Sequence, residues 1–246
     1  MPRLWIFFDA AGTLFAVRGS IGGQYALAAR RFGAVCDAEK LERAFYSLFP
    51  TASPMALPDK NGGRAPGRAA GRSKKTGIPL REREFQWWKN VVREICRQAG
   101  LALPFDAYFE FLFQNFATAR CWDVYPETLA TLKLLTLQGY SLGIISNFDS
   151  RLHALVGDLG LRPWISQVVH SSAVGAPKPD SRIFLEACAR ARVKPKHAWH
   201  VGDSLSEDFE AARRAGLNAV LLDRGGKNPD FSGPKVKRLS QLFPLL

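Results

Sequence analysis

The chain has 246 residues, of which 47% are hydrophobic, and its formal net charge is +12. The length and the hydrophobic content allow it to bury a sizeable core, either as one α/β domain or as a core with an insertion. Its N-terminal apolar run is short, is broken by Asp9 and has no small-residue cleavage site. Nothing approaches the roughly 20 apolar residues of a membrane span, so we expect no membrane partner and a cytoplasmic protein. The four cysteines form no Cys-x-x-Cys pair, which favours reduced thiols over a zinc site or a disulfide framework.

The first predicted element is an apolar strand over residues 4–8 that ends abruptly in a carboxylate, Asp9. Ligands of open parallel α/β sheets bind at the carboxyl ends of the strands. Asp9 is therefore a candidate nucleophile or metal ligand. The small residues Ala11 and Gly12 follow it, and then Thr13.

Four helices are predicted next. Tyr25, Ala28, Ala29 and Phe32 share one face of the first, with Gly33 as its stop. The others cover residues 38–49, 82–98 and 105–116.

A basic segment separates the second of these helices from the third. Residues 51–79 are rich in Gly, Pro and Ala, lack apolar periodicity and supply five of the net positive charges. Such a composition cannot bury enough surface to offset its ordering entropy, which predicts a mobile surface loop. Nucleic-acid binding is the alternative, and the absence of interleaved aromatic residues for base stacking makes it the less favoured one.

The remaining segments repeat the pattern of an apolar strand that ends in polar residues. After a helix that ends near Gln138, a strand at 142–145 leads to Ser146 and Asn147, and a further strand covers 167–170. Lys178 lies in a proline-containing loop before a helix from Ser181. A strand at 198–201 leads to Gly202, Asp203 and Ser204, with Asp208 beyond. A helix from Leu205 ends at Gly216, and 219–222 is the last predicted strand.

The ordered polar residues resemble the motifs of the haloacid dehalogenase-like hydrolase superfamily, which are Asp-x-Asp-x-Thr, a Ser/Thr, a Lys and Gly-Asp-x-x-x-x-Asp. The matching positions are Asp9, Thr13, Ser146, Lys178, Asp203 and Asp208. Position 11 departs from the pattern. The stretches 86–88, 146–149 and 200–203 resemble the subgroup of haloacid dehalogenase-like hydrolase domain-containing protein 3 and the insect rhythmically expressed gene 2 product, whose members also tend to lack the second motif-I Asp.

This resemblance implies an α/β fold, with a Rossmann-like parallel sheet, helices on both faces and an inserted all-helical cap. We expect the hydrolase core at 1–16 and 122–246. The cap is expected at 17–121, with the flexible basic loop near 51–80.

The resemblance also implies site chemistry. Asp9 would attack phosphorus to give an aspartyl phosphate, and Ser146 and Lys178 would bind the phosphoryl oxygens. Asp9, Asp203 and the backbone carbonyl of Ala11 would hold Mg²⁺, with Asp208 orienting Lys178 or a metal-bound water. The remaining phosphate-binding candidates are Ala11, Gly12, Thr13 and Asn147.

Ala11 replaces the general acid of the phosphatases of this superfamily. Three explanations are open: a leaving group that needs no proton, a substitute acid from the cap or the substrate, or a member that binds without turnover.

We expect a Mg²⁺-dependent phosphatase of low or specialised activity on a small phosphorylated molecule. The alternative is a catalytically weak or inactive module that binds a phosphorylated ligand or a protein. The sequence indicates no oligomeric state.

A dehalogenase or a C–P bond hydrolase is a further alternative, because each works without the missing acid. Dehalogenases of the superfamily typically lose the acid that Asp203 provides. Phosphonoacetaldehyde hydrolase has Ala at the same position but carries a Met-Gly-x-x-Lys cap signature, which this chain lacks.

Overall fold

In the computed structural model, which describes residues 4–52 and 78–246, the first apolar run forms β1 (Trp5–Phe8) inside a parallel sheet. The strand order is β5-β4-β1-β6-β7-β8. The other strands are β4 (Ser141–Ser146), β5 (Ile165–His170), β6 (Ala198–Gly202), β7 (Asn218–Leu222) and β8 (Lys235–Val236). Every residue of β4 is buried, as expected of a strand covered on both faces.

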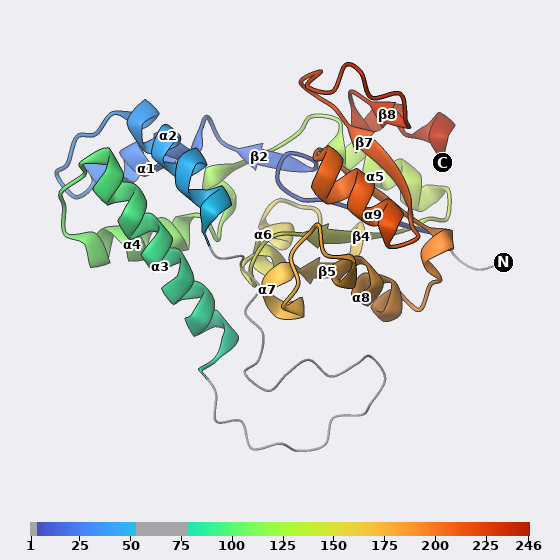
Figure 1. Cartoon of the computed structure of the whole chain (residues 1–246), viewed down its shortest axis with the longest axis horizontal. Coiled ribbons are helices and arrows are strands. Elements are labelled where there is room, and N and C mark those ends of the chain that lie inside the picture. Colours follow the sequence, from blue (N-terminus) through green and yellow to red (C-terminus); the bar gives the residue numbers. More distant parts are fainter. Residues whose placement is uncertain (1–3, 53–77) are drawn as a thin grey trace. The chain divides into compact units, whose positions relative to one another are not determined.

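Helices cover the two faces of this sheet (Figure 1). Right-handed crossovers place α5 (Thr128–Leu137) and α6 (Leu152–Asp158) on one face, and α8 (Ser181–Ala191) and α9 (Ala211–Arg214) on the other. Phe7, Ile145 and Val169 point to the α8 and α9 face, where they join one buried apolar cluster. The strand order changes direction at β1, so Asp9 lies at the switch point where such sheets bind ligands.

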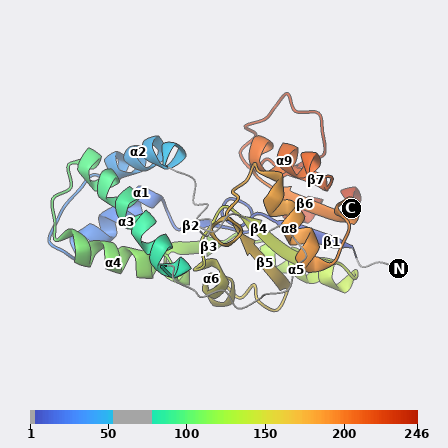
Figure 2. The ribbon, with the colours of Figure 1, turned by 60° about the horizontal axis from the view of Figure 1, so that its bottom comes forward.

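The helical insertion consists of α1 (Ile21–Arg30), α2 (Ala38–Leu48), α3 (Leu80–Ala99) and α4 (Phe105–Asn115). Its helices pack around an aromatic-rich core that includes Tyr25, Phe45 and Phe109. Ser20 and Asp37 cap the first two helices by accepting backbone N–H groups, which fixes where those helices begin. Figure 2 shows the four helices from a second direction.

The chain enters and leaves this insertion through β2 (Phe15–Val17) and β3 (Trp122–Val124), which pair with each other. Contacts divide the described chain into a core unit, residues 4–16 and 124–246, and a cap unit, residues 17–52 and 78–123. A short helix, α7 (Ser171–Val174), completes the core unit. Most of the predicted basic loop, residues 53–77, lies outside the described residues.

The prediction that 219–222 is the last strand is wrong. β8 pairs with β7 through Lys235 and Val236 and forms the edge of the sheet. A two-residue strand is too short to show alternation, and its register is set by β7. The sequence therefore contains no local signal for it.

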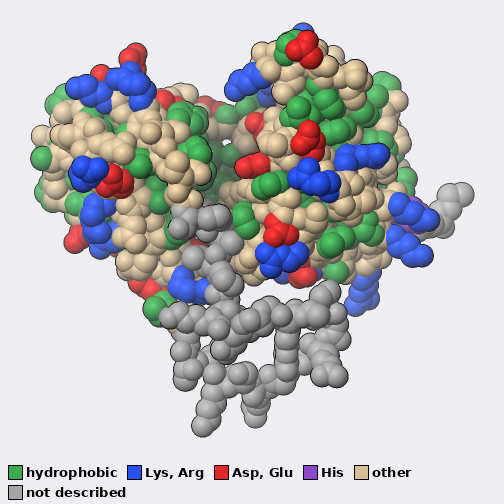
Figure 3. Space-filling model, viewed as in Figure 1, with side chains coloured by type: hydrophobic (Ala, Val, Ile, Leu, Met, Phe, Trp, Pro, Cys, Tyr) green, Lys and Arg blue, Asp and Glu red, His purple; other side chains and the backbone are tan. Residues whose placement is uncertain are grey.

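Three findings bear on the expectations drawn from the composition, namely the spread of surface charge, the length and polarity of the helices, and the state of the cysteines. On the face drawn in Figure 3, Lys and Arg side chains are spread over the described residues and interspersed with Asp and Glu. None of the described helices is both long and apolar enough to cross a membrane. All four cysteines are free, and burial raises the pKa of the Cys96 thiol to about 12.

Two leucines on α5 test the inferred packing. Leu135 is fully buried, whereas Leu137 is 71% exposed. Leu135→Ala should lower the free energy of unfolding by about 2–5 kcal/mol, because it leaves a cavity. Leu137→Ala should change it by less than about 0.5 kcal/mol. Urea unfolding monitored by circular dichroism measures both, and equal losses would contradict the inferred packing of α5.

Candidate active site

The turn after β1 brings Asp9 to the edge of the sheet. The Asp9 amide donates to the carbonyl of Val201 in β6 (2.9 Å), and the residue is only 6% exposed. The turn then closes through a hydrogen bond from the Leu14 amide to the carbonyl of Ala10 (2.8 Å). Gly12 has φ +92°, and a Cβ there would lie 2.5 Å from Asp203 Oδ2. Only glycine fits this backbone, because the turn and the carboxylate lie in direct contact.

The segment after β6 supplies the acidic residues. Asp203 is solvent-exposed and accepts a hydrogen bond from the buried hydroxyl of Thr13 (3.4 Å). One turn of π-helix, Leu205–Glu210, follows, and the Ser204 hydroxyl caps it by accepting from the Glu207 amide (3.2 Å). A Cβ at Gly202 would lie 2.2 Å from Asp208 Cγ, so this glycine lets the Asp208 side chain fold back against the strand.

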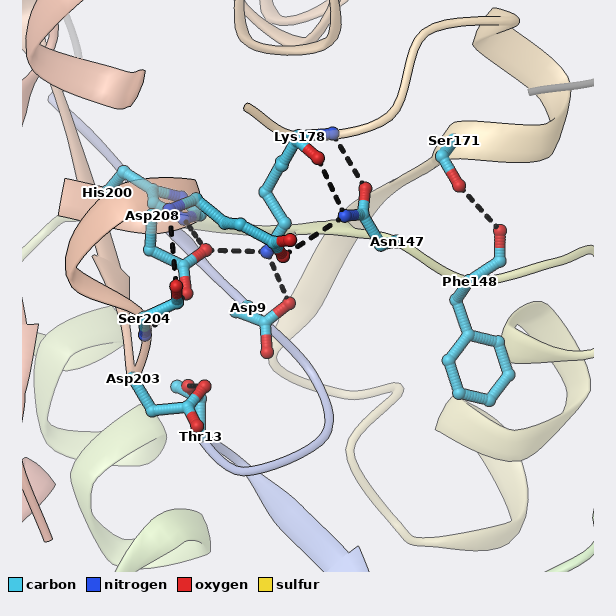
Figure 4. Close-up of polar contacts among 11 residues, drawn as sticks. Asp9, Thr13, Asn147, Phe148, Ser171, Lys178, His200, Asp203, Ser204 and Asp208 are labelled. Carbon is cyan, nitrogen blue, oxygen red and sulfur yellow. Dashed lines mark hydrogen bonds and ion pairs between the residues drawn. The ribbon is translucent and has the colours of Figure 1, made fainter. Parts of the chain in front are cut away.

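Lys178 connects the two acidic segments. Figure 4 shows its side chain extending from the loop before α8 to a point between Asp9 and Asp208. The Lys178 ammonium donates to Asp9 Oδ1 (2.6 Å) and to Asp208 Oδ1 (2.5 Å), and all three residues are buried. A buried ammonium between two carboxylates is stable only with such geometry, since each charge has lost its hydration.

His200 and a backbone amide provide the remaining hydrogen bonds to the Asp208 carboxylate. His200 Nε2 lies 2.9 Å from Asp208 Oδ1, and the Ser204 amide donates to Oδ2 (3.0 Å). Nδ1 of His200 is buried without a hydrogen-bond partner among the described residues. We therefore assign the proton of a neutral ring to Nε2, since an unpartnered ring nitrogen costs less when it carries no proton. Both oxygens of Asp208 are thus engaged by the protein.

These contacts shift the pKa values of the three aspartates in different directions from the usual value of an aspartate. Burial raises the pKa of Asp9, and the ammonium of Lys178 only partly offsets this. Although Asp203 reaches solvent, partial desolvation of its carboxylate and the charges of Asp9 and Asp208 raise its pKa to about 7. Burial alone would raise the pKa of Asp208, but Lys178 and His200 bring it below its usual range. Burial opposes the charge of Lys178, yet Asp208 and Asp9 raise its pKa above the usual value. Asp208 and Lys178 therefore stay ionised, whereas the protein compensates the negative charges of Asp9 and Asp203 only in part.

Asn147 positions the Lys178 loop. Its side-chain oxygen accepts from the Lys178 amide (2.7 Å), and its Nδ2 donates to the Lys178 carbonyl (3.0 Å). The same Nδ2 donates to Glu207 Oε2 (3.2 Å). Ser146 precedes Asn147 at the end of β4, where it is buried in register with His170 of β5. Asn147 therefore ties the end of β4 to the two segments that carry Lys178 and Asp208.

The acidic residues can hold a hard cation. Asp9, Asp203 and Asp208 each offer a carboxylate oxygen, and these atoms lie within 4.8 Å of one another. Because both oxygens of Asp208 are already engaged by the protein, Asp9 and Asp203 are the better candidate ligands. A cation would relieve the repulsion that raises their pKa values, and an all-oxygen donor set suits Mg²⁺. The residues present therefore fit that metal.

Three contacts of this site are not signalled by the motifs. His200 belongs to β6 and reads as an ordinary strand residue. Glu207 reads as a helix acid. Arg224 donates to the carbonyl of Thr13 (3.0 Å), pairs with Glu127 (2.7 Å) and lies over the Tyr125 ring, so it braces the turn after Asp9. The sequence signal for all three is weak, because each depends on register and side-chain direction across the sheet.

Comparison with known proteins places this site in a family. The haloacid dehalogenase-like hydrolase model matches residues 5–216, and the chain belongs to that family. It is 35% identical to haloacid dehalogenase-like hydrolase domain-containing protein 3 of Mus musculus, over 97% of this chain and 92% of that protein. It is 29% identical to the Rhythmically expressed gene 2 protein of Drosophila melanogaster, over 88% of this chain and 82% of that protein. The resemblance inferred from the motifs is confirmed.

Solved structures share the fold. The L-2-haloacid dehalogenase PA0810 superimposes with a TM-score of 0.73 at 20% identity, over 99% of this chain and 98% of that one. Bacillus subtilis YfnB, in a structure bound to magnesium, superimposes with a TM-score of 0.68 at 16% identity, over 99% of both chains. The parallel sheet with a helical insertion is therefore confirmed. At these identities the likeness concerns the fold alone.

The buried ion pairs generate a stability prediction. Lys178→Met should lower the free energy of unfolding at neutral pH by about 3–5 kcal/mol, because it leaves two buried carboxylates without their cation. The exposed Lys133→Met serves as the control and should have little effect. Chemical unfolding in EDTA measures both.

The same variant has a predicted pH dependence. Asp208, with its lowered pKa, contributes stability above its unfolded value of roughly 3.9 and loses it as pH falls. Lys178, with its raised pKa, contributes below its unfolded value of roughly 10.4 and loses it as pH rises. The loss in Lys178→Met should therefore be greatest between about pH 5 and 9 and shrink below about pH 4. A loss that is constant down to pH 3 would contradict the assigned ion pairs.

Proposed function

We propose that the protein is a Mg²⁺-dependent phosphatase that acts on a small phosphorylated molecule through Asp9. The observation that carries this proposal is the position of the Lys178 ammonium, which lies 2.6 Å from the candidate nucleophile. Phosphoryl transfer requires a positioned nucleophile and positive charge at the transferring oxygens. Asp9 and Lys178 provide both, at the edge of the sheet where ligands bind.

The proposed roles follow from the contacts. The Asp9 carboxylate attacks phosphorus and becomes an aspartyl phosphate, which water then hydrolyses. Lys178 binds a phosphoryl oxygen while Asp208 keeps it charged and oriented. Ser146 and the Ala11 amide are the further proposed phosphate-binding groups, whereas the Gly12 amide already donates to the Phe15 carbonyl (2.8 Å). Asp9, Asp203 and the Ala11 carbonyl are the proposed ligands of Mg²⁺, which when bound offsets the negative charge of the phosphoryl group.

Two other functions compete with this one. The chain retains Asp203, which the dehalogenases it resembles typically lack, and this disfavours halide displacement. Ala11 favours the second alternative, a module that binds a phosphorylated ligand without turnover. We rank it second because the Asp9 carboxylate, held 2.6 Å from Lys178, repels a phosphoryl group and is a group that binding alone does not require.

Hydrolysis assays test the proposal. The protein should hydrolyse p-nitrophenyl phosphate and acetyl phosphate in millimolar Mg²⁺, because both have good leaving groups. EDTA and Asp9→Asn should each abolish this activity, whereas the exposed Asp158→Asn should retain it. Phosphate binding without hydrolysis across a broad panel of phosphate esters would contradict the enzyme and support the binding module.

Metal binding gives a separate prediction. Asp203→Asn should weaken Mg²⁺ binding by at least about tenfold, since losing even a supporting contact of a metal ligand costs roughly 10–100-fold. Isothermal titration calorimetry measures the affinity, with Asp158→Asn as the control. An unchanged Mg²⁺ affinity in Asp203→Asn would show that the metal binds elsewhere.

A further inference from the structure

The proposed reaction lacks a proton donor at position 11. A phosphate ester of an ordinary alcohol needs a proton on its departing oxygen, and a positioned acid of this kind contributes typically about 10²–10⁴-fold. The methyl group of Ala11 can neither give nor take a proton. Efficient hydrolysis of an alkyl phosphate therefore requires another acid at this edge of the sheet.

The direction in which the alcohol leaves limits which residues could donate a proton to it. Asp9 is buried, and Lys178 and Asp208 occupy its protein side. A phosphoryl group on Asp9 must therefore release its alcohol toward solvent. Among the described residues of the core unit, two solvent-exposed carboxyl groups are tied to the site by hydrogen bonds, namely those of Asp203 and Glu207. Asp203 is assigned to the metal, which leaves Glu207.

Glu207 is held in place but is not neutralised. Its Oε2 accepts from Asn147 Nδ2 (3.2 Å), the amide that also binds the Lys178 carbonyl. Its backbone is fixed by the Ser204 cap. No Lys or Arg in the described part of the chain forms an ion pair with it, in contrast to Glu210 on the same turn, which pairs with Arg214 (3.8 Å). Partial burial raises the pKa of Glu207, with Asp208 and Asp9 adding to the rise and with Lys178 and the Asn147 hydrogen bond opposing it. The Glu207 carboxyl group therefore keeps its proton to a higher pH than an ordinary glutamate does.

We propose that Glu207 is the general acid and base that takes the place of the side chain missing at position 11. This inference rests on the proposed phosphatase function. In the first step a bond forms between Asp9 and phosphorus, the bond from phosphorus to the alcohol oxygen breaks, and the Glu207 proton passes to that oxygen. In the second step the Glu207 carboxylate removes a proton from the water that attacks phosphorus, which releases phosphate and restores both carboxyl groups to their starting states.

Glu207→Gln tests this role, because glutamine keeps an oxygen that accepts from Asn147 but cannot donate a proton as an acid. The values of kcat/KM for an alkyl phosphate and for p-nitrophenyl phosphate are compared in wild type and variant. The value for the alkyl phosphate should fall by about 10²–10⁴-fold. The value for p-nitrophenyl phosphate, whose leaving group scarcely needs a proton, should fall far less. Glu210→Gln, on the same turn, is the matched control and should change neither value.

Two further measurements separate acid catalysis from a structural role. The ratio of wild type to Glu207→Gln on the alkyl phosphate should shrink as pH rises, because wild-type Glu207 then loses its proton. Ala11→Asp should restore the alkyl phosphatase activity of Glu207→Gln, since it supplies a carboxyl group at the other position.

Several outcomes would overturn the inference. Equal losses on the two esters would make Glu207 a support for Asn147 and Lys178, and unchanged values on both would remove it from the mechanism. If no Asp9-dependent hydrolysis of p-nitrophenyl phosphate is seen in the wild type, the proposed function itself fails. That failure is thereby distinguished from a failure of the Glu207 assignment.

Discussion

The structure of this site depends on one buried cation. The Lys178 ammonium lies between Asp9 and Asp208, from segments far apart in the sequence, and all three groups have lost most of their water. Neither carboxylate would be tolerated there alone, and the lysine without them would lose its proton. The remaining features hold this triad in register. Asn147 fixes the Lys178 backbone, and His200 and the Ser204 amide fix Asp208.

The position of Lys178 between two carboxylates also gives the three aspartates different roles. Both carboxylate oxygens of Asp208 contact hydrogen-bond donors of the protein, so Asp208 acts as the structural counter-ion of Lys178. Asp9 and Asp203 are left as the carboxylates that repel each other and gain from a cation. Mutual repulsion of this kind costs stability, and a bound cation would reduce that cost. Unfavourable electrostatic interactions of this kind are common at functional sites and uncommon in stable cores.

Much of this arrangement could be predicted from the sequence, and the reasons differ by residue. The strands that precede Asp9, Asn147 and Asp203 are mostly apolar, and a parallel sheet necessarily brings their ends to one edge. The position of Lys178 came from the order of the motifs and not from its local sequence. The strand β8, the His200 contact to Asp208 and the brace by Arg224 could not be predicted, because each depends on register or on side-chain direction across elements. Glu207 was missed for the same reason, as its spacing matches an ordinary exposed helix acid.

The central claim is that Asp9 is a nucleophile and not only a metal ligand. The most direct test is to mix the protein with acetyl phosphate and Mg²⁺, quench with acid within milliseconds and identify the modified peptide by mass spectrometry. A transient phosphoryl group should appear on the peptide that contains Asp9, and it should be absent in Asp9→Asn and absent in EDTA. Steady hydrolysis of acetyl phosphate with no phosphorylated Asp9 at any quench time, in a protein that retains activity after Asp9→Asn, would contradict it.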